Sequence, residues 1–201
     1  MDQDIVTCQK GKGVSEISLY VVGEGIAKVD KSSLQLTKLS VGDKDLLKDE
    51  IGRLNYELGF FPDIEEGGKL AEFEIKIKSG LDQLSGPLSM EGSIVFEVGN
   101  EVQIDESDFF NPLVDKEMQV GPLKMTSEQD DDQFIFNIEG YDESIASVKL
   151  INQANEDINS TGYFSSGSSR TERFEKTDDK KVKLVVSHYK SIEPQKIKIK
   201  L

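Results

Sequence analysis

Apolar and polar residues alternate along much of this chain with the two-residue period of strands that bury one face. Residues 72–78, for example, alternate charged and apolar side chains. Near the carboxyl end, two such runs at residues 182–188 and 197–201 lie on either side of Pro194. Because a proline cannot donate a hydrogen bond to a β-ladder, this pattern predicts two strands with a connection between them.

The strand-like runs continue through the whole chain, which at 201 residues is long enough for two domains of about 100 residues each. The apolar fraction is 36% and the charged fraction 31%, which suits thin layers whose strands expose one face. We therefore expect an all-β protein with two tandem antiparallel β-sandwich domains. The predicted boundaries are a loose leader at 1–13, a first domain at 14–108, a stiff junction at 109–116 and a second domain at 117–201.

Residues 44–58 are the segment in which a helix competes with a strand. Asp43 is a suitable N-cap, and apolar residues at helical spacing follow it. However, strict alternation up to Leu58 and the helix-disfavouring Gly52 indicate a strand. We expect a helical turn near residues 44–50 and then a strand, and a single helix through Leu58 stays open as the alternative.

The second half has about seven strand-like runs at spacings of about 8–12 residues, among them residues 140–150 and 181–189. This pattern resembles the immunoglobulin-like sandwich domains of many bacterial cell-envelope and secreted proteins. The chain has one cysteine and no tryptophan, so it lacks the paired cysteines and core tryptophan of antibody domains. The resemblance implies an immunoglobulin-like second domain and an extracytoplasmic location, whether periplasmic, on the cell surface or secreted. It carries over no functional residue.

The formal net charge of −14 restricts the classes of partner. Nucleic-acid binding needs a basic face that neutralises phosphates, and an anionic membrane surface repels an acidic protein. No run of apolar residues approaches the length of about 18 that a membrane span needs. We expect no nucleic-acid partner and no membrane insertion, and we expect contact with another protein or a cell-surface component.

Few residues are candidates for catalysis. His188 is the only histidine and Cys8 the only cysteine, so the sequence assigns no histidine metal cluster and no pair of nucleophile and base. The position of Cys8 is that of an acylated lipoprotein cysteine, but it lacks the small residue expected directly upstream. We expect that the protein is not an enzyme. A hydrolase that uses paired carboxylates is the third alternative.

Two pairs of adjacent aromatic residues are the candidate binding residues. Tyr163 and Phe164 lie in a serine- and glycine-rich segment, residues 160–169, which is typical of a loop. Phe109 and Phe110 lie in the acidic junction. Because loops and exposed strand edges are common contact surfaces, we expect a non-catalytic, extracytoplasmic binding or structural module that uses these four residues.

Calcium is the one cofactor that the sequence suggests. Asn155, Asp157 and Asn159 offer oxygen ligands at every second position, as the first half of a calcium-binding loop does. No glycine follows Asn159, and Ser166 stands where the closing glutamate is expected. The favoured interpretation is a hydrated hairpin whose side chains bind their own backbone. The alternative function is a calcium-dependent or carbohydrate-binding adhesin.

Overall fold

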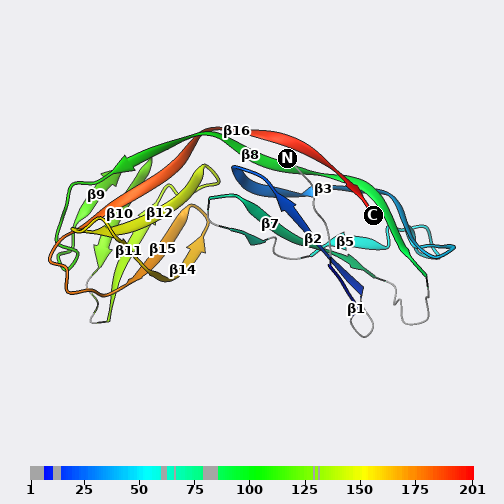
Figure 1. The fold of residues 1–201 in the computed structure, drawn as a ribbon, viewed down its shortest axis with the longest axis horizontal. Helices are drawn as coiled ribbons and strands as arrows, with labels where there is room; N and C mark the ends of the chain where they lie inside the picture. Colours follow the sequence, from blue (N-terminus) through cyan, green and yellow to red (C-terminus); the bar gives the residue numbers. More distant parts are fainter. Residues whose placement is uncertain are drawn as a thin grey trace. The chain divides into compact units, whose positions relative to one another are not determined.

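The structure is a computed structural model, and it describes residues 7–10, 15–59, 63–65, 67–78, 86–128, 130 and 132–201. These residues form an all-β protein without helices, as the sequence predicted (Figure 1). The strands are β1 (Thr7–Lys10), β2 (Ser15–Val22), β3 (Ile26–Val41), β4 (Lys44–Asp45), β5 (Tyr56–Leu58), β6 (Asp63–Ile64), β7 (Leu70–Ile77), β8 (Leu88–Glu106), β9 (Glu117–Val120), β10 (Leu123–Glu128), β11 (Gln133–Glu139), β12 (Ile145–Asn152), β13 (Asp157–Ile158), β14 (Ser160–Ser166), β15 (Ser169–Glu175) and β16 (Val182–Lys200). Within the described ranges, no helix has the length and apolarity needed to cross a membrane.

The strands form three sheets, with the orders β1-β2-β7-β5, β14-β15-β11-β10-β9 and β13-β12-β16-β8-β3-β4, and β6 also pairs with β7. The chain divides into two compact units. The first contains the described part of Met1–Gly99 together with Ile192–Leu201, and the second is Asn100–Ser191. The long strands β8 and β16 are neighbours in the third sheet, and each contributes residues to both units (Figure 1).

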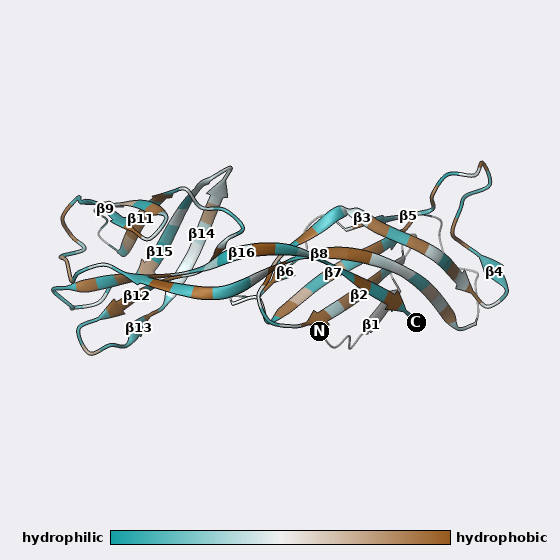
Figure 2. Cartoon of the chain, turned by 90° about the horizontal axis from the view of Figure 1, so that it is seen from above, coloured by the Kyte–Doolittle hydropathy of each residue, from teal (hydrophilic) through white to brown (hydrophobic). Residues whose placement is uncertain are grey.

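These units differ from the expected division at 109–116. Residues 100–116 belong to the second unit, and residues 192–201 belong to the first. The difference has a physical cause, because β8 and β16 continue through the positions at which loop signals in the sequence suggested an end. Figure 2 shows apolar and polar bands that alternate along both strands.

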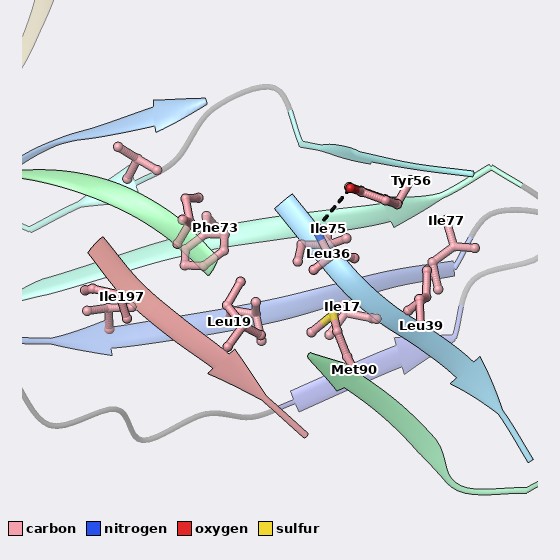
Figure 3. Packing of buried hydrophobic residues seen from close by; sticks show 14 of the residues in the cluster. Ile17, Leu19, Leu36, Leu39, Tyr56, Phe73, Ile75, Ile77, Met90 and Ile197 are labelled. Carbon is pink, nitrogen blue, oxygen red and sulfur yellow. Dashed lines mark hydrogen bonds between the residues drawn. The ribbon is translucent and has the colours of Figure 1, made fainter. Parts of the chain in front are cut away.

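The core of the first unit takes buried side chains from both of its sheets (Figure 3). On β2 and β7, Leu19 lies opposite Phe73, so alternate residues of the two strands turn to the same face. The Tyr56 hydroxyl on β5 accepts a buried hydrogen bond from the backbone N–H of Leu36 on β3 at 3.0 Å. This bond joins the two sheets across the core.

The core of the second unit is centred on aromatic rings. Phe136 on β11 is fully buried, and its ring centroid lies 6.0 Å from that of Phe110 and 5.9 Å from that of Phe174 on β15. Both contacts have the edge-to-face geometry that aromatic pairs prefer. Leu184 and Val186 of β16 belong to the same cluster, so this core also takes side chains from two sheets.

The prediction of two strands around Pro194 is wrong, because β16 is continuous from Val182 to Lys200. The described pairing of β12 with β16 reaches Tyr189, whose N–H donates to Ser144. In the described residues the ladder of β12 with β16 ends before Pro194, and β8 is the other neighbour of β16 in the sheet. A proline is tolerated on an edge strand because its missing N–H leaves no partner unpaired.

The helical turn expected near residues 44–50 is also wrong, since this segment contains β4 and a turn. Asp49 accepts hydrogen bonds from the backbone N–H groups of Arg53 and Ile51, which hold the pKa of its carboxyl below the ordinary value. The Asn55 side chain is buried and donates to the Leu46 carbonyl. These local bonds between side chains and backbone stabilise the turn in place of a helix.

Two segments expected to be irregular contain strands. The leader includes β1, which pairs with β2 through Thr7 opposite Ser18. The serine-rich segment 160–169 forms a hairpin of β14 and β15. In both segments the ladder with a neighbouring strand overrides the weak local signal of the sequence.

Candidate functional site

The hairpin of β14 and β15 is built by two glycines. Gly167 has φ of 61°, the conformation that a two-residue type II′ turn requires at its first central position. Gly162 has φ of 142° and lies where the register shifts between Ser160 and Gly162, which marks a β-bulge. After this bulge the pairing is regular, with Tyr163 opposite Glu172 and Phe164 opposite Thr171.

Tyr163 and Phe164 project from opposite faces of their sheet. Glu172 lies between Tyr163 on β14 and the buried Phe136 on β11, so Tyr163 is on the face that carries the core. Phe164 is therefore on the other face. Tyr163 is 62% exposed and Phe164 is 64% exposed. The strand thus presents a large ring on each side of its edge.

Arg170 on β15 fixes the position of the Tyr163 ring. Its guanidinium carbon lies 3.6 Å from the centroid of Tyr163 and 4.5 Å from the centroid of Tyr141. Arg170 also forms an ion pair with Glu172, which is 3% exposed. Since a cation over an aromatic face is attractive, this contact favours one orientation of the exposed Tyr163 ring.

The edge of β14 differs from the other sheet edges. It is seven residues long, whereas the terminal strands β1, β4, β5, β9 and β13, together with the short β6, have two to four residues. Among the strands named here, β14 alone carries no charged residue, and the sequence has no charge between Asp157 and Arg170. Proteins usually protect exposed edges with charges or short strands. Of the strands compared here, β14, with its long neutral edge and two exposed rings, is the one most open to pairing with another chain.

Phe109 and Phe110 lie in different environments. Phe110 is 4% exposed, packs edge-to-face on Phe136, and exchanges backbone hydrogen bonds with Val182 at 2.9 Å. Its side chain is therefore a core residue, not a contact surface. Phe109 is 40% exposed, and the Nζ of Lys183 lies 5.8 Å from its ring centroid.

The candidate calcium ligands are engaged in separate interactions. The carboxylate of Asp157 lies 2.7 Å from the Nζ of Lys149 on β12. The side-chain amide of Asn159 donates to Glu175 at 3.0 Å, and Asn155 has φ of 63° in the turn before β13. Among the described residues, no group of three or more His, Cys, Asp or Glu side chains is placed to hold a metal ion.

The two residues considered for catalysis, His188 and Cys8, take part in local contacts. The Nε2 of His188 lies 2.8 Å from the carboxylate of Asp105, which lies against the backbone of Gly121. The backbone of Cys8 pairs with Ile17.

An open groove of about 710 Å³ in the first unit has two carboxylates, those of Asp30 and Glu97, in its lining. Hydrogen bonds from the Ser32 hydroxyl and backbone lower the pKa of Asp30. A general acid in glycoside hydrolysis needs the opposite shift.

Sequence reasoning missed Arg170, Glu172 and Tyr141. The alternation of the sequence could have indicated the ion pair. Arg170 and Glu172 alternate with the buried Phe174 and therefore share its core-facing side. Charged residues at core-facing positions need a partner. Comparison of the chain with protein-family models, with curated proteins and with solved structures gave no match.

Proposed function

We propose that this chain is a non-catalytic binding or structural module that contacts another protein through the edge of β14. The observation that carries the proposal is the long, uncharged terminal strand with Tyr163 and Phe164 exposed on opposite faces. An extended segment of a partner adds to such an edge through backbone hydrogen bonds. The two rings then select the side chains of that segment, because alternate residues of an added strand lie on alternate faces.

The two compact units are β-sandwich domains in this proposal. Each buried cluster takes side chains from two sheets, as the core of a sandwich does. The second domain is immunoglobulin-like in architecture. Constant-type immunoglobulin domains have the strand orders A-B-E-D and C-F-G in their two sheets. The second domain differs from them, because its first strand, the end of β8, is a neighbour of its last strand, the start of β16.

The proposed location is extracytoplasmic. It is supported by the resemblance of the second half to small sandwich domains of bacterial envelope and secreted proteins. Fractionation of cells that express the natural gene from its own start tests this location, and recovery of the protein in the cytoplasm alone would overturn it.

Peptide selection tests the β14 contact without knowledge of the natural partner. Random peptides displayed on phage are selected on the folded chain and then measured against Ser165→Lys and Ser191→Lys. Ser165 is an exposed residue of β14, and Ser191 is an exposed residue of β16, so the two variants add the same charge on different strands. We expect Ser165→Lys to weaken binding by about tenfold or more, because a lysine on the edge opposes strand addition, and Ser191→Lys to leave it unchanged.

The comparison requires that both variants show the wild-type circular dichroism spectrum, so that a change in binding reflects the β14 edge and not a loss of fold. Peptides that bind Ser165→Lys as tightly as wild type would remove β14 from consideration. Replacement of both Tyr163 and Phe164 by serine is the second arm, and it abolishes binding if the rings provide the selectivity.

A further inference from the structure

The β14 edge also indicates the chemistry of its occupant. Resting on the function proposed above, we infer that β14 of a second copy of this chain pairs with β14 in an antiparallel arrangement across a two-fold axis. Tyr163 then lies opposite Tyr163 of the second copy, and the two five-stranded sheets that contain β14 become continuous. A contact of this kind is isologous, since the same surface is used on both copies.

The sequence of β14 is self-complementary in this register. A two-fold axis perpendicular to the sheet brings the same faces of both strands together, so Gly162 lies opposite Phe164 of the second copy. Phe164 is 64% exposed, and its ring covers the backbone that Gly162 leaves bare, which is a stabilising arrangement at sheet edges. An axis at Phe164 would instead place Gly162 opposite Ser166 and leave the glycine uncovered.

Hydroxyl side chains flank this central pairing. Thr161 is the extra residue of the β-bulge, so the regular register covers Gly162–Phe164, and Ser160, Thr161, Ser165 and Ser166 lie on either side of it. β14 therefore brings no charged side chain against the second copy.

Charge favours this edge over the other described terminal strands. A formal net charge of −14 opposes the association of two copies in general. β14 carries no charge, and Glu172 on the adjacent strand is paired with Arg170, so the register brings no like charges together. Pairing through β5 would instead place Glu57 opposite Glu57 of the second copy, which is destabilising.

A second copy also supplies the side chains that the edge needs. In this register the Tyr163 rings of the two copies lie next to each other on one face of the sheet, and on the other face each Phe164 ring lies over Gly162 of the other copy. Each copy therefore covers both exposed rings of the other.

Disulfide trapping tests the register directly. In a Cys8→Ser background, Tyr163→Cys and Phe164→Cys are oxidised mildly and separated on a non-reducing gel. Residues directly opposite have Cβ atoms about 4.5–5.5 Å apart, and diagonal residues about 7–8 Å, whereas a disulfide needs about 3.5–4.5 Å. We expect a covalent dimer from Tyr163→Cys and little from Phe164→Cys. The reverse pattern, or no covalent dimer from either variant although the wild-type chain dimerises in sedimentation, would overturn the register.

Sedimentation of the wild-type chain over a concentration series provides the independent readout. We expect reversible dimerisation that Ser165→Lys weakens by about tenfold or more and that Ser191→Lys leaves unchanged. If wild type stays monomeric while selected peptides bind at β14, the self-association fails and the proposed function stands. If neither peptides nor a second copy bind there, both proposals fail.

Discussion

The adjacent residues Phe109 and Phe110 allow one prediction with an internal control. Phe110 is 4% exposed and packs at 6.0 Å from Phe136, so Phe110→Ala removes a buried ring and leaves a cavity. Truncation of a buried phenylalanine costs about 3–5 kcal/mol of unfolding free energy. Phe109 is 40% exposed, and its contact with Lys183 is of a kind that contributes about 0.5–1 kcal/mol at exposed sites. We therefore expect Phe109→Ala to cost about 1 kcal/mol or less.

Urea unfolding followed by far-ultraviolet circular dichroism measures both variants, because the chain has no tryptophan for fluorescence. Since the chain has two compact units, hydrogen exchange of peptides from β10 to β15, which all lie in the second unit, separates its response from that of the first. Equal losses for the two variants, or a larger loss for Phe109→Ala, would contradict the assignment of Phe110 to the core.

Two further predictions concern the second unit. We expect Gly121→Ala to lower the melting temperature more than Gly167→Ala does. Both glycines have positive φ, but a Cβ at Gly121 would overlap the Asp105 carboxylate, whereas nothing lies near a Cβ at Gly167. Equal shifts in melting temperature would refute the steric argument. Arg170→Met removes the cation beside the buried Glu172, and we expect it to lower the free energy of unfolding in urea by about 3–5 kcal/mol. The double variant Arg170→Met/Glu172→Met recovers most of this loss. An Arg170→Met variant as stable as wild type would show that the ion pair does not stabilise the fold.

Strands with one clear period were predictable from the sequence alone. The alternation in residues 72–78 predicted β7, because each of its side chains turns either to the core or to solvent. The lengths of β8 and β16 were not predictable in this way. Gly99 and Pro194 carry turn signals, and only the neighbouring strand in the sheet shows that the backbone stays extended at these positions.

The turn at residues 44–58 shows a different limit of sequence reasoning. Helical spacing of apolar residues after Asp43 competes with the local bonds of Asp49 and Asn55, and the sequence does not show which set forms. Gly52, with φ of 80°, fits the turn and disfavours the helix.

The candidate site was predictable in part. The exposed positions of Tyr163 and Phe164 follow from their polar surroundings, but the strand that carries them needs β15 as a partner to form. Nothing in the local pattern distinguishes Phe110 from Phe109, since either of two adjacent rings can turn inward. The backbone hydrogen bonds between Phe110 and Val182 determine which of the two rings turns inward, and they join residues that are far apart in the sequence.

The central claim is that the backbone edge of β14 pairs with another strand. Amide hydrogen exchange, resolved by nuclear magnetic resonance on the labelled wild-type chain, measures this pairing at low and high protein concentration and with a selected peptide. We predict that edge-facing amides of Ser160–Ser166 gain protection in both titrations. Protection that appears on β16 between residues 192 and 200 while β14 stays unchanged would contradict the claim.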